Sequence, residues 1–268
     1  MKTNKISILG CGWLGLPLAK EFISKGFSVK GSTTSIDKMA VLETNDIQPF
    51  LIAVSEDGIE GEMTDFLENS NLLIIDIPPK LRGENKENFV LKIKNLIPFI
   101  EKASIEKVLF ISSTSVYADD NSIVTEETIP NPDTESGKQL LEAEKLLQHN
   151  SNFKTTILRF GGLIGEDRHP IKHISGRENL ENPEGAINLI HLDDCIGIIE
   201  SLVASNYWGE TFNAVSPHHP TRYNYYSEKA ISLDWPLPKF RHDKPSHSKV
   251  ISSAKVEKIL QYQFKTAL

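Results

Sequence analysis

A glycine-rich turn between an apolar run and an amphipathic segment constrains the fold of this sequence more than any other feature. The turn is Gly10–Gly15 (GCGWLG). It follows the β-branched run Lys5–Leu9, and apolar residues then recur at helical spacing through Ile23. A strand, a glycine turn and a helix in this order begin the sheet of many nucleotide-binding α/β proteins. The sequence therefore predicts such a unit around residues 5–24.

Each glycine of the turn has its own role in this prediction. Gly10 permits the tight turn, Gly12 allows the backbone to approach a pyrophosphate, and Gly15 permits close packing of the helix on the strand. The free amides and the dipole at the start of the helix favour the two phosphates. We therefore predict a dinucleotide site formed by Gly10, Gly12, Trp13, Leu14 and Gly15. The alternative is an ordinary tight turn between a strand and a helix.

The end of the second expected strand bears on the choice of cofactor. An acidic residue roughly 20 residues after the glycine turn normally binds the ribose 2′-hydroxyl of NAD. Here the stretch contains Ser32, Thr33 and Thr34, with Lys38 further on, and its first acid is Asp37. Hydroxyl groups and a lysine suit a 2′-phosphate, so we expect NADP(H), with NAD still permitted. A solvated turn that contacts neither cofactor is the alternative.

Short apolar runs alternate with segments of helical period along the rest of the chain. Further strands are expected at 72–77, 107–112, 155–160 and 188–192. This alternation is typical of an α/β fold with a doubly wound, Rossmann-type parallel sheet.

The composition of residues 161–188 interrupts this pattern. The segment is rich in Gly, Pro, Asn and charged residues, which indicates an excursion over the surface. We predict an NAD(P)-binding Rossmann domain over 1–161 and 187–206, and a small C-terminal substrate-binding cap over 162–186 and 207–268.

Charge and cysteine content exclude several other classes of protein. The 268 residues include 29 Lys and Arg and 36 Asp and Glu, a net charge of −7, which argues against nonspecific binding to nucleic acid or anionic membranes. No run approaches the ~18 apolar residues of a membrane span. Cys11 and Cys195 are far apart, so neither a disulfide framework nor a metal site is expected. These features predict a soluble, cytoplasmic globular protein.

Several later motifs carry a family resemblance that covers nearly the whole chain. They are Phe110–Tyr117 (FISSTSVY), Arg159–Gly165 (RFGGLIG), Ile190–Asp194 (IHLDD), Phe212–Ala214 (FNA) and Ser252–Lys255 (SSAK). With the glycine turn, they resemble the extended short-chain dehydrogenase/reductase family, which contains sugar-nucleotide epimerases and dehydratases. The GWLG turn, SSTSVY and Arg168–Pro170 (RHP) are most similar to its atypical bacterial YeeZ-type group.

The resemblance implies a catalytic serine or threonine with a Tyr-x-x-x-Lys pair, and this chain retains only part of that set. Ser113 matches the serine. The family spacing places Ser136 at the tyrosine and Leu140 at the lysine, and the register anchored on Lys138 also lacks the tyrosine. Tyr117 is then the available phenol, so Ser113 and Tyr117 are the predicted catalytic residues. A packing role for Tyr117 is the alternative.

Other positions follow from the same resemblance. It places Ile77, Pro78, Ser112 and Gly161 along the cofactor. The excursion after residue 161 would cross the substrate cleft. It contains an acid-free basic stretch that includes Arg168, His169 and His173, which suits a small anionic substrate. A solvated basic loop is the alternative. In the family, the helices of the fourth and fifth crossover units often form a dimer interface, so the resemblance allows a homodimer and leaves the oligomeric state open.

Two functions remain open from the sequence. The first is an NADP(H)-dependent oxidoreductase or epimerase-like enzyme with an unusual proton donor, acting on a small or nucleotide-linked carbonyl compound. The second is a sensor or regulatory protein that binds NADP(H) without turnover. Ser136 and Leu140 favour the sensor, whereas Ser113, Tyr117 and the basic stretch favour the enzyme.

Overall fold

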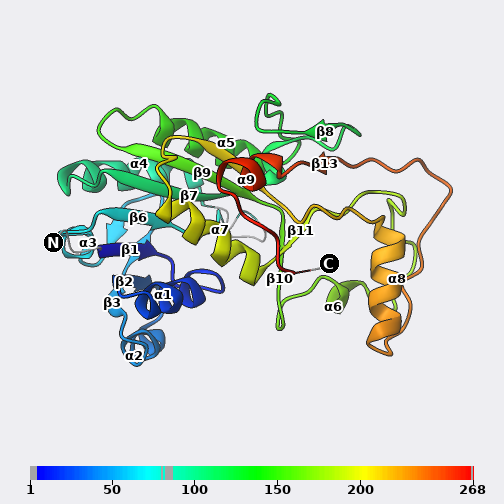
Figure 1. The fold of residues 1–268 in the computed structure, drawn as a ribbon, viewed down its shortest axis with the longest axis horizontal. Coiled ribbons are helices and arrows are strands. Elements are labelled where there is room, and N and C mark those ends of the chain that lie inside the picture. The colour runs from blue at the N-terminus through cyan, green and yellow to red at the C-terminus, as the bar shows by residue number, and fades with distance from the viewer. Residues whose placement is uncertain (1–4, 80, 82–86, 267) are drawn as a thin grey trace.

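A seven-stranded parallel sheet forms the centre of the computed structural model, which describes residues 5–79, 81, 87–266 and 268 (Figure 1). The strand order is β12-β9-β7-β6-β1-β2-β3. Their bounds are β1 Lys5–Leu9, β2 Ser28–Thr33, β3 Gln48–Leu51, β6 Leu72–Ile75, β7 Lys107–Ser113, β9 Lys154–Phe160 and β12 Thr211–Ala214. The order reverses between β1 and β6, as in a doubly wound Rossmann sheet. The predicted fold class is confirmed.

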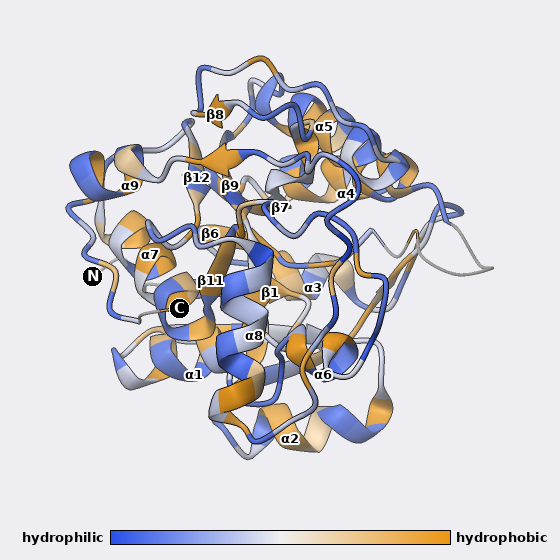
Figure 2. Cartoon of the chain, turned by 90° about the vertical axis from the view of Figure 1, so that its right-hand side faces the viewer, coloured by the Kyte–Doolittle hydropathy of each residue, from blue (hydrophilic) through white to orange (hydrophobic). Residues whose placement is uncertain are grey.

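Helices cover both faces of this sheet and bury its apolar strands. On one face lie α1 (Gly15–Ser24), α2 (Met39–Glu43), α7 (Leu192–Ala204) and α9 (Ala254–Ile259), and on the other α3 (Met63–Leu67), α4 (Phe89–Lys102) and α5 (Glu135–Gln148). All four residues of β6 are buried, as a strand covered on both faces requires. Figure 2 shows hydrophobic strands inside and helices with one polar side outside.

Local sequence signals set the ends of these helices. Gly26 follows α1 with φ +82°, which is a conformation that glycine adopts without strain. The side chains of Asn88 and Thr134 accept backbone amide hydrogens at the starts of α4 and α5. None of the helices in the described part of the chain is long and apolar enough to cross a membrane.

A smaller region extends beyond the carboxyl ends of the strands. It contains the parallel pair β10 (Gly162–Ile164) and β11 (Leu189–His191), with the helices α6 (Ile171–Ile174) and α8 (Arg222–Ser232), seen at the right of Figure 1. Ile164, Ile171, Leu189, Tyr225 and Tyr226 belong to its separate apolar core. Two further small pairs join β8 (Ile123–Val124) to β13 (Val250–Ile251), and β4 (Ala53–Val54) to β5 (Ile59–Glu60).

The boundaries of this region differ from those expected. β12 falls within 207–268, yet it pairs with β9 at the edge of the central sheet, and Val256 of α9 belongs to the core on that sheet. The expected strand at 188–192 pairs with β10 outside the central sheet. Strands of three or four residues carry too little hydrophobic alternation to show which sheet they join.

Candidate functional site

The glycine turn lies at the carboxyl end of β1, where the strand order reverses. A Cβ atom on Gly10, whose φ is +106°, would lie 2.4 Å from the carbonyl oxygen of Asp76. A Cβ on Gly15 would lie 2.2 Å from the carbonyl oxygen of Gly10. Gly12 is exposed, and no atom would lie within 4 Å of a Cβ there. Two glycines therefore close the turn, whereas the third leaves its outer side open to a ligand.

The backbone amides that directly follow Gly12 come just before α1. Within the described part of the chain, no hydrogen bond joins the amides of Trp13 and Leu14 to a protein acceptor. The turn itself is fixed from β2, because the Gly10 amide donates to Ser32 Oγ at 2.8 Å and the Cys11 amide to Ser32 O at 2.8 Å. Free amides on a helix start held in this way form an anion-binding site.

The hydroxyl groups predicted to select the cofactor divide into two sets. Ser32 is buried, and its hydroxyl holds the glycine turn. Thr33 is also buried, and its Oγ1 accepts the Ser35 amide at 3.1 Å. Thr34 and Lys38 are exposed. Of these four side chains, only those of Thr34 and Lys38 are available to a ribose phosphate, so the structure narrows the residues predicted to select the cofactor to these two.

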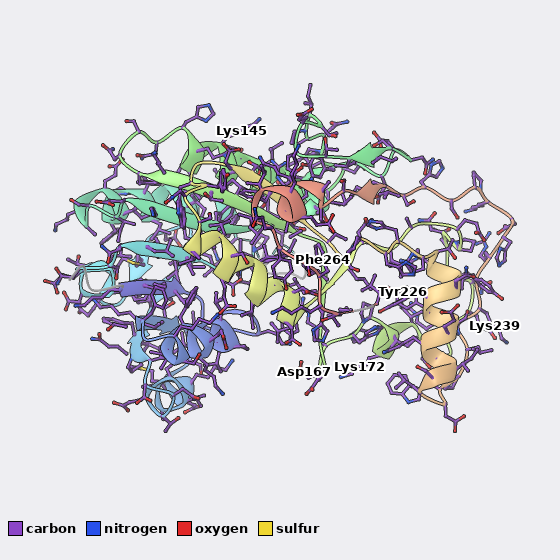
Figure 3. The ribbon with its side chains drawn as sticks, viewed as in Figure 1. Lys145, Asp167, Lys172, Tyr226, Lys239 and Phe264 are labelled. Carbon is purple, nitrogen blue, oxygen red and sulfur yellow. The ribbon has the colours of Figure 1, made fainter. Side chains whose placement is uncertain are left out.

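A turn from the smaller region covers Trp13. The indole Nε1 donates to Asp167 Oδ1 at 2.8 Å, and the guanidinium of Arg168 lies 5.0 Å from the centre of the indole ring. Lys172 Nζ donates to the carbonyl oxygen of Asp167, and Figure 3 shows both residues at this turn. Arg168, predicted to bind substrate, thus lies beside the glycine turn.

His169 has a structural environment that differs from its predicted role as an anion ligand. Its Nδ1 accepts the Ile171 amide at 3.1 Å, which assigns the proton to Nε2, 2.8 Å from Tyr225 OH. Burial, and then Lys229 and Lys172, lower the pKa of His169 to about 4. The ring is therefore uncharged at neutral pH. His173 on α6 is exposed.

The hydroxyl of Tyr117 lies in a buried polar network and not in an open cleft. It is 2.5 Å from Arg159 Nη1 and 3.2 Å from both Asn213 Oδ1 and the carbonyl oxygen of Thr125. Burial raises its pKa, which opposes use as an activated phenol. The hydroxyl of Tyr117 is thus engaged within the protein, as the packing alternative expects, and its role as proton donor stays a prediction.

Ser112 belongs to the same network, so its side chain is engaged within the protein, and its contact with the cofactor stays a prediction. Its Oγ donates to Glu144 Oε1 at 2.6 Å. Glu144 also accepts both Nε and Nη2 of Arg159, at 3.0 and 2.5 Å, in a buried bidentate ion pair. This network joins β7 and β9 to α5.

Ser113 remains available at the carboxyl end of β7. It is partly exposed, and its Oγ accepts the Ser115 amide at 3.1 Å, which leaves its own proton free to donate. Ser136 is partly exposed at the start of α5, and Lys138 is exposed. Leu140 is buried in the core between the sheet and α4. A lysine at position 140 would enter this core.

The remaining predicted cofactor-binding positions lie next to the glycine turn or directly after β9. Ile77 is partly buried, with its Cγ2 3.2 Å from the Cβ position of Gly10, and Pro78 is exposed. Gly161 permits a close crossing, since a Cβ there would lie 2.5 Å from the carbonyl oxygen of Asn188. Within the described residues, no group of three His, Cys, Asp or Glu could hold a metal ion.

Asp76 was not predicted as a site residue, although it is the one charged residue in the apolar run 72–77. It directly follows β6, and its carboxyl group accepts the Gly15 amide. Burial raises the pKa of Asp76 to about 8, while the Gly15 amide and the charge of Arg168 act in the opposite direction. A lone acid in such a position is the signal that could have identified it.

The sheet order and the glycine turn at its reversal define a Rossmann-type α/β protein. Comparison with known sequences narrows this class. The chain is 32% identical over 263 residues to Protein YeeZ of Escherichia coli (strain K12), a match that covers 97% of this chain and 96% of YeeZ. The chain belongs to the YeeZ family, as its motifs predicted. No family model matches it.

Solved structures agree with this fold over almost the whole chain. A Methylobacillus flagellatus protein assigned as an NAD-dependent epimerase/dehydratase is 25% identical with a TM-score of 0.80, and the match covers 98% of this chain and 93% of that one. UDP-glucuronic acid 4-epimerase from Bacillus cereus, in complex with UDP-glucuronic acid and NAD, is 18% identical with a TM-score of 0.79. This match covers 98% of this chain and 95% of the epimerase chain.

Proposed function

We propose that this protein binds NADP(H) at the glycine turn and reduces or epimerises a small or nucleotide-linked carbonyl compound that carries an anionic group. The open side of Gly12 carries the proposal, because it lies between two glycines that cannot accept a side chain. The amides of Trp13 and Leu14 would bind the pyrophosphate there. A carbonyl compound is proposed because hydride transfer is the chemistry that a bound nicotinamide supplies.

Thr34 and Lys38 support NADP(H) over NAD(H). Both are exposed after β2, and neither is acidic. A hydroxyl and an ammonium group suit a 2′-phosphate, whereas a carboxylate would suit a 2′-hydroxyl. The Bacillus cereus epimerase is a complex with NAD, so NAD remains permitted for this chain.

Ser113 is the proposed hydrogen-bond donor to the substrate carbonyl. Its free proton at the end of β7 can stabilise negative charge that develops on the carbonyl oxygen. The exposed cations Arg168 and Lys172 are proposed to bind the anionic group, and His173 lies exposed next to Lys172 on α6. His169 is not counted among these cations, because its pKa is lowered to about 4 by burial.

A sensor that binds NADP(H) without turnover is the second candidate, and two observations favour it. Leu140 occupies the lysine position with a buried apolar side chain. Tyr117 is held by Arg159 and Asn213 within the protein. The family's lysine is therefore absent, and the phenol that would replace the family's tyrosine is engaged within the protein.

Single-turnover oxidation of NADPH, followed by absorbance, separates these candidates. The protein is mixed with NADPH and a panel of 2-oxo acids, sugar-phosphate aldehydes and keto nucleotide sugars. The enzyme predicts oxidation that falls roughly 10²–10³-fold in Ser113→Ala. Ser136→Ala is the matched control and should leave the rate unchanged. Tight NADPH binding would identify the sensor only if no compound oxidises NADPH and no nucleotide sugar is epimerised in the presence of NADP+, because an epimerase returns the hydride and oxidises no NADPH overall. Absence of binding would refute both.

A further inference from the structure

A carboxyl group lies against Gly15, at the helix start beside which the dinucleotide phosphates are proposed to bind. Asp76 follows β6, the strand next to β1 across the reversal of strand order. Its Oδ2 lies 3.2 Å from the position that a Cβ on Gly15 would take, and it accepts the Gly15 amide. Gly15 is the first residue of α1, so the carboxyl group lies on the same helix start as the proposed pyrophosphate.

One positive charge and two thiols face Asp76 in the described part of the chain. The cation is Arg168, which stacks on Trp13 of the glycine turn. Cys11 follows β1 and Cys195 lies in α7, and the charge of Asp76 acts on both. Burial raises the pKa of Cys11 to about 12 and that of Cys195 well above its usual value, so both thiols stay neutral. A carboxylate and a pyrophosphate would therefore share a single facing cation.

We propose that Asp76 couples dinucleotide binding to proton uptake: the pyrophosphate binds tightly while the carboxyl group of Asp76 holds a proton, and the carboxylate form of Asp76 weakens this binding. The inference rests on the proposed dinucleotide site. Two like charges several ångströms apart near a protein surface change affinity by about a hundredfold. Arg168, freed from a neutral Asp76, is then available to the phosphates.

The coupling falls in an accessible pH range. The pKa of Asp76 is raised to about 8 by burial. Below that pH the carboxyl group already carries its proton, so binding takes up none. Above it the proton must come from solvent, and affinity falls about tenfold per pH unit until the carboxylate form itself binds.

Calorimetric titration with NADH and NADPH between pH 7 and 9.5 tests this. The wild-type protein is expected to bind less tightly above pH 8, to a limit of about a hundredfold. Titrations at pH 9 in buffers of different ionisation enthalpy should report uptake of about one proton. Asp76→Asn should bind at pH 9 as the wild type does at pH 7, with no uptake. Glu166→Gln, which removes an exposed carboxylate from the turn that covers Trp13, is the control and should keep the wild-type slope.

Three results would overturn the inference. Wild-type affinity that does not change with pH would leave the dinucleotide site intact but remove the role of Asp76. Weaker binding by Asp76→Asn at pH 7, with the pH slope retained, would make Asp76 an ionised acceptor for the ligand. No binding of either nucleotide at any pH would refute the proposed function itself. Proton uptake by the wild type is measured without any variant, so the test does not depend on the folding of Asp76→Asn.

Discussion

Replacement of Gly12 by valine should remove dinucleotide binding while the fold survives. No atom lies within 4 Å of the added Cβ position, and Gly12 is exposed. The new side chain would occupy the space through which the phosphates reach the amides of Trp13 and Leu14. Each hydrogen bond to a charged group contributes about 1.5–3 kcal/mol, so loss of two weakens binding by at least about 10²-fold.

Calorimetry with NADPH at pH 7 measures this loss, and thermal unfolding checks the fold. The melting temperature of Gly12→Val should stay within about 3 °C of the wild type, because the change touches no neighbour and reduces the entropy of the unfolded chain. Gly15→Ala is the contrasting variant, since its Cβ would lie 2.2 Å from the carbonyl oxygen of Gly10 and should lower the melting temperature. Wild-type affinity in a folded Gly12→Val protein would refute the assignment.

Three further predictions follow from the same structure. The wild type should bind NADPH more tightly than NADH in paired titrations, and Thr34→Asp should reverse this order, because the new carboxylate repels a 2′-phosphate and accepts a hydrogen bond from a 2′-hydroxyl. Tighter binding of NADH than of NADPH by the wild type would contradict this prediction. Glu144→Gln should destabilise the protein by about 3–5 kcal/mol in urea unfolding, because it leaves the charge of Arg159 buried and unpaired; an unchanged midpoint would show that the ion pair contributes little. Without ligand, the free energy of unfolding should fall as pH rises towards 8. Folding raises the pKa of Asp76 from 3.8 to about 8, so between these values the native state holds a proton that the unfolded state has released. Thermal melts at pH 6 and 9 should show this loss of stability in the wild type and not in Asp76→Asn.

The glycine turn and the sheet could be predicted because both depend on local signals. Gly10, Gly12 and Gly15 are spaced for one backbone geometry, and β-branched runs mark the longer strands. The strand β12 could not be assigned to its sheet, because four residues do not specify a pairing partner. In the structure β12 pairs with β9 in parallel, with Thr211 opposite Ile157 and Ala214 opposite Phe160.

Side-chain direction in the site depends on partners that are distant in sequence. The hydroxyl of Tyr117 meets Arg159 and Asn213, which lie 42 and 96 residues away. Ser32 is occupied by the Gly10 amide from 22 residues away. A motif fixes the position of such a residue on its strand or loop, but the burial of its polar atom depends on what the fold brings opposite it.

Titration of the unmodified protein with NADPH is the most direct test of the account. Calorimetry at pH 7 should show one binding site per chain with a dissociation constant of about 1 μM, equivalent to about −8 kcal/mol. NADH should compete for the same site with lower affinity. If the folded protein releases no heat with either nucleotide at concentrations of about 1 mM, where affinities of about −4 kcal/mol are detectable, the glycine turn is only a connection between β1 and α1.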